Sequence, residues 1–523
     1  MNNKYLIFMI LSVLIMSCRS KETTFVFVES TDTHGHFVDF ARDATLIRRL
    51  RDSLGERMIL LDNGDNLQGT TFQYYSNHDT NQPNITAQFL NFFPYDVAGV
   101  GNHDIEAGRK VFDRVYGETK VPVVCANVVD ESSGKPYFKP YVVLERAGYR
   151  IAVLGLLTPY VVTWVPERLR PGLVFEPVET AAAQWVKVIR ETEKPDLLVG
   201  LFHSGWDSEP LSEADAARLG RENAAKWVAE HVPGFDLVFL GHDHRHRTDI
   251  VVNDEGDTVG VLDAGCRGEG LALATVTMRN GKKAYSKVDW VNTEQQVPDP
   301  EFQAMVQPYL DAVDTYQNRV VAELSVDINS DDAYKGPCLW VDAIHRCQLD
   351  VVRQEGVGAD ISIAAPLGSG KNLKAGLLTV KDFFTWYPFE NSLAVLSMTG
   401  EEVRRFLEYA FEQKDPIFNF DSGADILYEV DESKPFGERV HIKSMADGAL
   451  FSADSIYHVV MNSYRSMGGG NHLSQGVGWD RADIQSHIIW ESESDLRSLF
   501  IDWAAQQGRI EAAPLYHWKR VGK

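Results

Sequence analysis

Five apolar segments of this chain each end in a cluster of aspartate, asparagine or histidine. The clusters read STDTHGH, DNGD, GNHD, FHSGWD and GHDHRH. Helical patterns, such as residues 44–55 and 181–194, separate several of these segments, which predicts an α/β arrangement of strands and covering helices. Ligands of such sheets collect at the carboxyl ends of the strands. We therefore expect the five clusters to share one edge of the fold.

The side chains at this edge could bind two neighbouring divalent cations. They provide two carboxylates, four imidazoles and one amide oxygen, from Asp32, His34, Asp65, Asn102, His203, His242 and His244. Asp65 is the best candidate to bridge the cations. Mixed histidine and carboxylate ligation favours Zn, Mn, Fe or Co over calcium, whose sites are built from oxygen alone.

Each cluster also has a simpler interpretation. Gly-Asn is a common turn dipeptide, so Gly101-Asn102 alone could be a polar turn after a buried strand. An aspartate and a histidine two positions apart, as in Asp32 and His34, occur by chance. All five clusters in this order, each at a strand end, are hard to explain without a metal site.

In order, the motifs D-x-H, G-D, G-N-H, H-x-G and G-H-x-H resemble those of the calcineurin-like metallophosphoesterases. The whole chain after its N-terminal signal resembles their two-domain bacterial branch of 5′-nucleotidases and 2′,3′-cyclic-nucleotide 2′-phosphodiesterases. The resemblance implies an α/β fold: an N-terminal four-layer αββα metallophosphoesterase sandwich and a C-terminal α/β 5′-nucleotidase-type substrate domain.

The resemblance also implies two ligand sets. One metal would be held by Asp32, His34, Asp65 and His244, and the other by Asp65, Asn102, His203 and His242. Members of the 5′-nucleotidase branch often have glutamine at the position of His244, whereas histidine is usual in the wider superfamily.

His103 corresponds to the catalytic histidine that faces the scissile phosphate in this family. Glu106 stands where the 5′-nucleotidases have an aspartate that orients this histidine. Two cations would activate a water molecule for attack on phosphorus. The predicted edge offers no obvious activated serine or cysteine, so we expect no phospho-enzyme.

The C-terminal half would bind the nucleotide. The resembling enzymes hold a nucleobase between two aromatic rings, and Phe389 and Tyr464 are the matching positions; we add the neighbouring Asn391 as a substrate-binding residue. Without the resemblance, a buried core position would be the better interpretation of Phe389.

Two departures favour the cyclic-nucleotide branch. Nucleotidases usually carry GGDG, whereas residues 468–471 read GGGN, and the segment ISIAAPLGSGKN lacks the phosphate-binding arginine that follows their NGGG motif. We therefore expect a 2′,3′-cyclic-nucleotide 2′-phosphodiesterase and 3′-nucleotidase, with a 5′-nucleotidase as the alternative. A nucleotide-binding surface receptor on a degenerate enzyme fold is the non-enzyme alternative, but such a site would be expected to lose ligands.

Length and charge bound the remaining possibilities. A chain of 523 residues accommodates two or three domains. We place the metallophosphoesterase domain at 24–292, a linker helix region at 293–324 and the nucleotide-binding domain at 325–515. The formal charge of −23 argues against binding of long nucleic acids. Nothing in the sequence predicts the oligomeric state.

The N-terminus reads as an export signal. Residues 1–17 place Lys4 before an apolar run, and Ser17 is followed at once by Cys18. This order resembles a bacterial lipobox, in which Cys18 would carry lipid and become the new N-terminus. We thus predict an exported protein, lipid-anchored to the cell envelope; an ordinary cleaved signal is the alternative. The four other cysteines show no metal-finger spacing and predict buried free thiols.

Replacement of the lipidation site tests this interpretation. Cys18→Ser should move the protein from the membrane fraction to the soluble fraction, because the thiol that accepts lipid is lost. Fractionation followed by immunoblotting measures the shift, and Ser20→Ala serves as the control that stays with the membrane. Equal membrane association of the Cys18→Ser variant would contradict lipidation.

Overall fold

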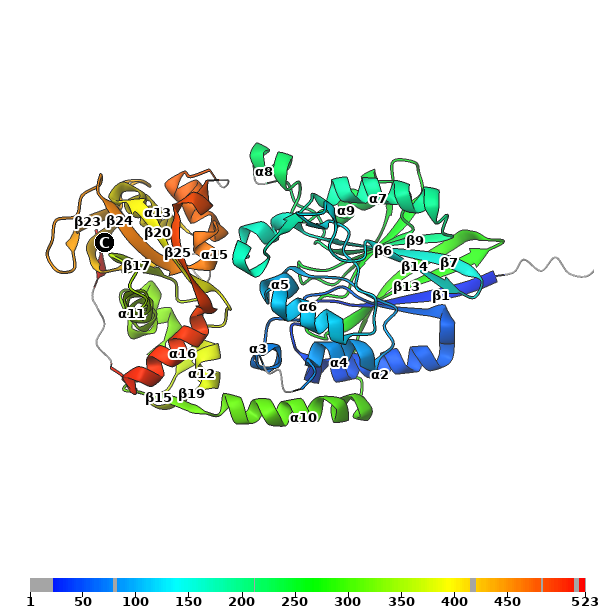
Figure 1. Ribbon diagram of the computed structural model, residues 1–523, viewed down its shortest axis with the longest axis horizontal. Coiled ribbons are helices and arrows are strands. Elements are labelled where there is room, and N and C mark those ends of the chain that lie inside the picture. The colour runs from blue at the N-terminus through cyan, green and yellow to red at the C-terminus, as the bar shows by residue number, and fades with distance from the viewer. Residues whose placement is uncertain are drawn as a thin grey trace, which may run out of the picture.

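The computed structural model describes residues 22–78, 82–210, 212–413, 420–480, 483–511 and 517–522. The predicted signal peptide and Cys18 lie outside these residues. Two domains lie side by side, and the long helix α10 (Pro300–Gln317) extends from one to the other (Figure 1). Among the described residues, no helix combines the length and apolar character needed to cross a bilayer.

Two β-sheets form the centre of the N-terminal domain. Their strand orders are β14-β13-β1-β2-β3 and β11-β12-β10-β9-β7-β6. The strands of the first sheet are β1 (Glu22–Ser30), β2 (Met58–Asp62), β3 (Val97–Ala98), β13 (Gly270–Arg279) and β14 (Lys282–Asn292). Those of the second are β6 (Tyr141–Arg146), β7 (Tyr149–Leu157), β9 (Leu197–His203), β10 (Leu237–Leu240), β11 (Arg247–Val252) and β12 (Thr258–Asp263).

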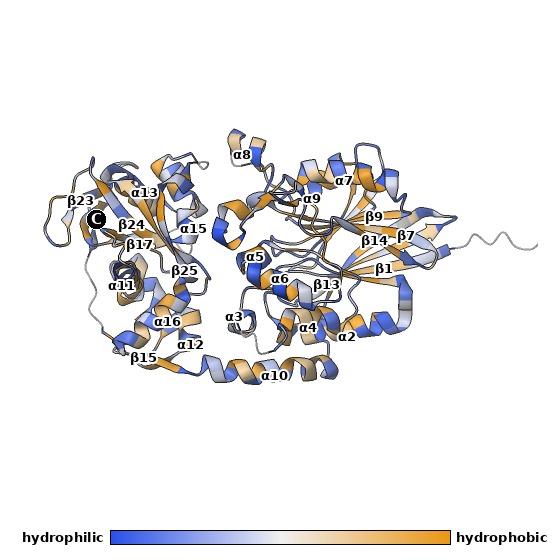
Figure 2. Cartoon of the chain, viewed as in Figure 1, coloured by the Kyte–Doolittle hydropathy of each residue, from blue (hydrophilic) through white to orange (hydrophobic). Residues whose placement is uncertain are grey.

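Alternation along the strands builds four layers. In β9, Leu197 and Val199 pack between the two sheets, whereas Leu198 and Phe202 pack against helices on the outer face. The strands are accordingly largely apolar, while the helices alternate polar and apolar residues (Figure 2). The predicted αββα sandwich is confirmed. The covering helices are α2 (Phe37–Leu54) and α4 (Ile85–Phe92) on the first sheet, and α7 (Val178–Thr192) and α9 (Ala225–His231) on the second.

The strands that carry the polar clusters run in parallel. β1 pairs with β2, β2 with β3, and β9 with β10, all in the parallel sense. The chain enters β1 on the side away from the C-terminal domain and leaves it towards that domain (Figure 1). The carboxyl ends of β1 and of the strands parallel to it therefore point towards the C-terminal domain.

The C-terminal domain is also α/β. Its central sheet has the order β21-β17-β24-β20-β25, and alternate residues of β20, such as Val395 and Leu396, pack into separate cores on its two faces. The strands are β17 (Ile361–Ala364), β20 (Ser392–Thr399), β21 (Ser422–Ala424), β24 (Ile456–Asn462) and β25 (Ile488–Asp495). The helices are α11 (Leu339–Gln354), α12 (Val380–Trp386) and α16 (Leu496–Gln507) on one face and α13 (Gly400–Glu412) on the other.

One boundary differs from the sequence prediction. The predicted linker ran to residue 324, but β15 (Val320–Leu324) pairs with β19 (Gly376–Thr379) and β26 (Arg509–Ile510), so the C-terminal sheets begin before Ser325. The β-branched residues Val320 and Val321 of β15 favour a strand over a continuation of α10. The apolar run at 121–127, between α6 (Arg109–Glu118) and β4 (Val128–Asp130), forms only isolated bridges. Pro122, its second residue, has no N–H to donate to a full strand.

The four cysteines of the described chain are free thiols; Cys125 and Cys347 are buried, whereas Cys266 and Cys338 are half-buried. The expected free thiols are thus observed, but only two of them are buried.

The two domains contact each other beside the cluster-bearing edge. Tyr74, in α3 (Thr71–His78), donates a hydrogen bond of 2.9 Å to Asp495 of the C-terminal domain. The guanidinium of Arg497 lies 4.6 Å from the Tyr74 ring and 3.2 Å from the Glu390 carboxylate. Because Glu390 lies between Phe389 and Asn391, this contact positions the predicted substrate-binding segment against the first domain.

Candidate metal centre and active site

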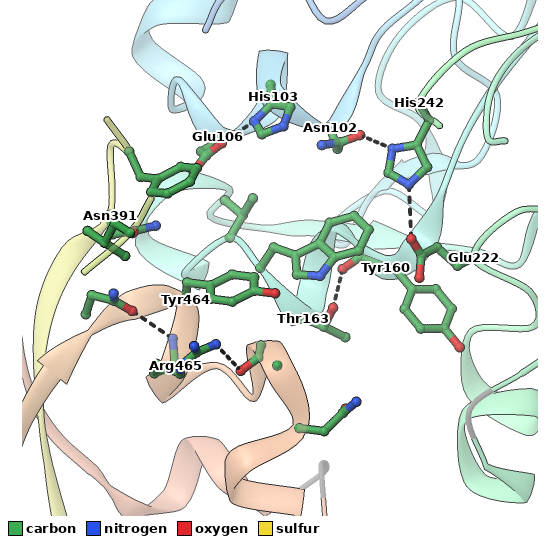
Figure 3. A pocket seen from close by; sticks show the side chains of 18 residues that line it. Asn102, His103, Glu106, Tyr160, Thr163, Glu222, His242, Asn391, Tyr464 and Arg465 are labelled. Atoms are coloured by element: carbon green, nitrogen blue, oxygen red, sulfur yellow. Dashed lines mark hydrogen bonds and ion pairs between the residues drawn. The ribbon is translucent and has the colours of Figure 1, made fainter. Parts of the chain in front are cut away.

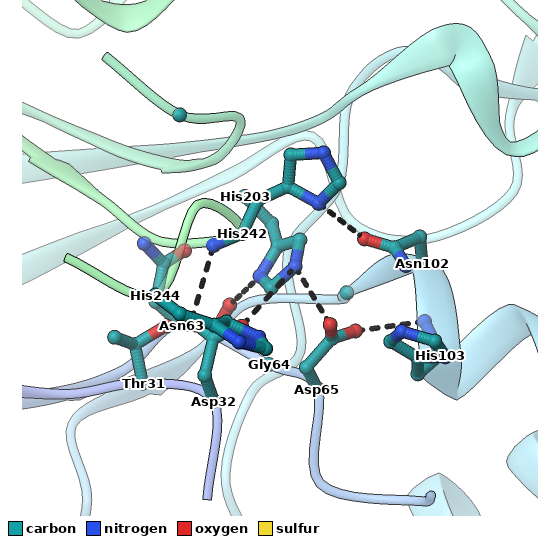
Figure 4. A network of polar contacts seen from close by, with 12 residues as sticks. Thr31, Asp32, Asn63, Gly64, Asp65, Asn102, His103, His203, His242 and His244 are labelled. Carbon is teal, nitrogen blue, oxygen red and sulfur yellow. Dashed lines mark hydrogen bonds and ion pairs between the residues drawn. The ribbon is translucent and has the colours of Figure 1, made fainter. Parts of the chain in front are cut away.

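Both sheets contribute to one cluster of side chains at the domain boundary. Asp32 and His34 follow β1, Asp65 follows β2, and Asn102 begins the short helix α5 (Asn102–Glu106) after β3. His203 is the last residue of β9, and His242 and His244 follow β10. The structure therefore brings together all seven side chains that were predicted as ligands. Figure 4 labels all of them except His34.

Four of these side chains form a compact group. One ligand atom each from Asp32, His34, Asp65 and His244 lies within 4.8 Å of the others. The His244 Nε2 atom lies 3.3 Å from Asp32 Oδ1 and 3.0 Å from His34 Nε2. The His34 Nδ1 atom lies 3.0 Å from the carbonyl of Gln68, which leaves Nε2 facing the group.

Of the remaining side chains, His203 lies beside Asp65, and Asn102 and His242 contact each other. The His203 Nε2 atom is 3.1 Å from Asp65 Oδ2, and its Nδ1 atom is 2.7 Å from the Asn63 carbonyl. The Asn102 Oδ1 atom lies 2.7 Å from His242 Nδ1 (Figure 4). Asp65 thus contacts both the compact group and His203, which is the position expected of a carboxylate between two cations.

Burial makes this donor set suitable for cations. Asp32, Asp65 and His203 are almost completely inaccessible, and Asp32 Oδ1, Asp65 Oδ2 and His203 Nε2 have no hydrogen-bond partner among the described residues. Burial disfavours the charged forms of His203 and Asp65. The carboxylates of Asp65 and Asp32 nevertheless raise the pKa of His203 to about 10. His203 in turn holds the pKa of Asp65 below its usual range. The same negative charge would attract a divalent cation.

The backbone at the centre is strained in a consistent way. Asp32, His34, Asp65, His242 and His244 have φ values of 49°, 47°, 55°, 80° and 58°, in the left-handed region that non-glycine residues rarely adopt. Such strain persists only where the surrounding structure enforces it, and it concentrates at functional sites. Five of the seven predicted ligands share it.

Asp104 fixes the loops beneath these side chains. Its buried carboxylate accepts hydrogen bonds from the backbone N–H groups of Gly101, Asp65, Asn66 and Leu67, at 2.8–3.0 Å. It thereby ties the start of α5 to the loop after β2. Gly101 permits this close approach, because a Cβ there would lie 2.1 Å from Asp65 Oδ1.

His103 and Glu106 form a pair on α5. The His103 Nδ1 atom lies 2.5 Å from Glu106 Oε2, one helical turn away. Burial opposes the charged form of His103, but the carboxylates of Asp65 and Glu106 raise its pKa to about 9. The extra methylene of glutamate, compared with aspartate, is compatible with this contact.

A cavity of about 500 Å³ lies between the domains. Asn102, His103, Glu106 and His242 line it from the N-terminal domain, and Phe389, Asn391 and Tyr464 line it from the C-terminal domain. Figure 3 shows Asn391 and Tyr464 on one side and the His103–Glu106 pair on the other. The structure thus places every predicted substrate-binding residue in one cavity with the predicted catalytic pair.

Comparison with known families agrees with this division into two domains. Residues 25–246 match the model of the calcineurin-like phosphoesterases, and residues 320–475 match that of the 5′-nucleotidase C-terminal domain. The chain belongs to the two-domain calcineurin-like phosphoesterases. The expected family and fold class are confirmed, and the chain is a metal-dependent phosphoesterase.

Individual relatives are distant but align along most of the chain. It is 24% identical to the 2′,3′-cyclic-nucleotide 2′-phosphodiesterase/3′-nucleotidase of Haemophilus influenzae, over 94% of this chain and 87% of that protein. The 5′-nucleotidase precursor of Thermus thermophilus is 22% identical, with a TM-score of 0.64 over 96% of this chain and all of that one. A candidate 5′-nucleotidase from Staphylococcus aureus has a TM-score of 0.76 at 18% identity, over 95% of this chain and all of that one.

Neighbouring residues hold the ring of Tyr464 in place. It lies in α15 (Ser463–Ser466), and the Arg465 guanidinium lies 5.3 Å from its ring. Arg465 is buried, pairs with Asp421 at 2.8 Å and donates to the Gly469 carbonyl at 3.1 Å. A Cβ at Gly469 would lie 2.6 Å from the Tyr464 ring, so glycine permits the loop to pack on the ring.

Sequence reasoning missed several residues of this site. Trp164 and Glu222 line the cavity, and Trp164 stacks on His242 with a centroid distance of 5.5 Å. Glu222 Oε1 lies 3.2 Å from His242 Nε2. Both residues lie in connecting segments without a strand-end pattern, so only the three-dimensional arrangement identifies them.

The ligand and catalytic assignments predict different defects. Asp65→Ala should lose bound metal and activity, because it removes a carboxylate shared by both groups. His103→Ala should retain metal but lose about 10²- to 10⁴-fold in kcat, as expected for a proton donor. Elemental analysis and steady-state kinetics measure both effects. Full metal content in Asp65→Ala would contradict its assignment, and metal loss in His103→Ala would contradict the catalytic role.

Proposed function

We propose that this protein is a dinuclear-metal phosphohydrolase of nucleotides, with 2′,3′-cyclic-nucleotide 2′-phosphodiesterase and 3′-nucleotidase activity. The observation that carries this proposal is the shared cavity, in which His103 from one domain faces the same space as Phe389 and Tyr464 from the other. A phosphoester near His103 can therefore belong to a molecule whose base contacts the aromatic residues.

The proposed cofactor is a pair of divalent cations chosen from Zn, Mn, Fe and Co. Asp32, His34, Asp65 and His244 would hold one, and Asp65, Asn102, His203 and His242 the other. The buried atoms of Asp32, Asp65 and His203 that make no hydrogen bond support this assignment. When bound, the cations supply Lewis acidity towards the phosphoryl oxygens and make water a better nucleophile.

His103 would act on the phosphoryl group. Glu106 would accept a hydrogen bond from Nδ1–H, so Nε2–H of a protonated His103 can donate to a phosphoryl oxygen or to the leaving oxygen. The high pKa of His103 keeps this proton available at neutral pH. Its backbone N–H also donates to Asp65 Oδ1 at 2.7 Å, which links the position of the proton donor to the shared carboxylate.

Phe389 and Tyr464 would contact the nucleobase. Stacking on an aromatic ring is worth about 1–3 kcal/mol per base and tolerates any base. Gly470, at the position where nucleotidases have an aspartate for the ribose, lines the same cavity without a side chain. Recognition should therefore depend on stacking more than on contacts with the ribose hydroxyls.

Several relatives support the cyclic-nucleotide preference over the alternative. Proteins named 2′,3′-cyclic-nucleotide 2′-phosphodiesterase/3′-nucleotidase from Haemophilus influenzae, Salmonella typhimurium and Yersinia enterocolitica are 23–24% identical to this chain. The missing arginine in ISIAAPLGSGKN and Gly470 favour the same branch. A 5′-nucleotidase remains the second candidate, because two of the structures with this fold carry that name.

The proposed location is the cell envelope, where Cys18 would anchor the enzyme through lipid and the substrate would be an extracellular or periplasmic nucleotide.

A substrate panel tests the proposed activity. Purified enzyme is assayed with 2′,3′-cyclic, 3′- and 5′-nucleotides in the presence of Mn, Zn, Co or Mg. The 2′,3′-cyclic and 3′-nucleotides should have the highest kcat/KM, the measure of discrimination between substrates. A clear preference for 5′-AMP would move the protein to the 5′-nucleotidase branch, and no metal-dependent phosphate release from any nucleotide would favour the receptor.

Removal of a stacking ring should affect binding of nucleotides only. Tyr464→Ala should raise KM for nucleotides about ten- to a hundredfold, because about 1–3 kcal/mol of stacking is lost. Hydrolysis of a small aryl phosphate should be nearly unchanged, because the metal centre is in the other domain. Phe436→Ala removes an exposed aromatic ring of the C-terminal domain and is the control. An equal loss for both substrates would contradict the base-stacking role.

A further inference from the structure

We infer that Glu222 is a positioning residue that orients His242 and strengthens its binding to a metal cation. This inference rests on the proposed function, since it takes His242 as a ligand. Glu222 lies outside all five motif clusters, in the connection between β9 and α9. Its carboxylate approaches the ring of His242 from the side opposite Asn102 (Figure 3).

The two ring nitrogens of His242 have different partners. Nδ1 lies 2.7 Å from Asn102 Oδ1, and Nε2 lies 3.2 Å from Glu222 Oε1. A cation on the Nδ1 side would take the lone pair of that nitrogen and the Oδ1 atom of Asn102 as ligands. The single proton of the neutral ring would then be on Nε2, where the Glu222 carboxylate, which can only accept, receives the hydrogen bond.

His242 differs from two other proposed ligands in this outer contact. The Nδ1 atoms of His34 and His203 face the backbone carbonyls of Gln68 and Asn63, at 3.0 and 2.7 Å. These carbonyls are neutral and independent of the side chain at their position. Of the three histidines, His242 is the one whose outer contact is a carboxylate, and this contact can be removed by substitution.

The backbone around Glu222 is held rigidly. Ser204 donates its hydroxyl to the Glu222 carbonyl and accepts from the N–H of Ala224, both at 2.9 Å. The side chain of Asn223 accepts from the N–H of Gly205 at 3.1 Å. The segment is thereby attached to the two residues that directly follow His203, a proposed ligand of the same cation.

The ring of His242 is also fixed from its face. Trp164 stacks on it with an interplanar angle of 29°, and the His242 side chain is only 12% exposed. Together, Glu222 fixes rotation of the ring in its plane, while Trp164 fixes the plane itself. A carboxylate that accepts the outer proton of a metal-bound histidine also raises the electron density on the ligating nitrogen.

The geometry therefore assigns different outer contacts to the two cation positions. Loss of the Glu222 charge should weaken the cation held by His203, Asn102 and His242, and should leave the one held by Asp32, His34 and His244 unchanged. Outer partners of this type contribute about 10- to 100-fold to metal affinity.

Metal titration of the full-length, metal-free protein tests this inference. Isothermal titration with Co²⁺ is performed on the wild type, Glu222→Gln and Glu222→Ala, with Glu213→Gln as a matched control at an exposed acid of the same connection. Glu222→Gln keeps the size of the side chain and a weaker acceptor. We expect two equivalents in all proteins, with one of the two loosened about 10- to 100-fold in Glu222→Gln, at least as much in Glu222→Ala, and not in Glu213→Gln.

Activity and stability measurements complete the test. The kcat of Glu222→Gln should fall at limiting Co²⁺ and recover at saturating Co²⁺, with KM for nucleotide and the metal-free Tm unchanged. Unchanged affinity for both equivalents would overturn the inference, as would a raised KM at full metal occupancy, because Glu222 would then contact substrate. Equal weakening of both equivalents with a lowered metal-free Tm would also overturn it. A wild-type protein that binds fewer than two equivalents would instead contradict the proposed dinuclear centre.

Discussion

The site depends on two carboxylates, Asp32 and Asp65, that are buried at the ends of parallel strands. A buried charge is costly unless opposite charge or hydrogen bonds surround it. This requirement explains why loops from two different sheets must meet at one point and why their backbone adopts left-handed conformations. The strands beneath are covered on both faces, so they can hold such loops rigidly. The carboxylate of Asp104 accepts hydrogen bonds from four backbone N–H groups and thereby holds α5 at a fixed position relative to the loop after β2.

The residues proposed for catalysis and those proposed for substrate recognition lie in separate domains, and both domains line the cavity. The N-terminal sandwich carries the metal-binding cluster and His103, whereas the C-terminal sheet presents Phe389 and Tyr464. Neither wall is complete alone. The contact between Tyr74 and Asp495, and the stack of Arg497 on Tyr74, hold the walls together in this arrangement. The relative position of the domains is therefore part of the site itself.

The sequence predicts the features that depend on local pattern. The clusters at strand ends were visible because an apolar run, a turn and a ligand follow one another directly, and the αββα sandwich followed from the resemblance that these motifs carry. The strand at Val320–Leu324 was missed because a helical pattern precedes it without a clear break. Glu222 and Trp164 could not be predicted, since they reach His242 through the tertiary fold and their neighbours in the chain show no periodicity.

The exposure of the cluster explains where its composition can vary. The side chains of Asp32 and His203 are completely buried, so a change of charge or shape there would leave buried partners unpaired. The His244 side chain is 38% exposed, although its Nε2 atom lies 3.3 Å from Asp32 Oδ1. A glutamine at this position, as in many 5′-nucleotidases, would replace one neutral metal-ligating atom by another. Solvent could accommodate the remainder of the side chain. His244 is thus the position of this cluster at which a change of residue type disturbs the buried charges least, and its identity says little about the choice of substrate.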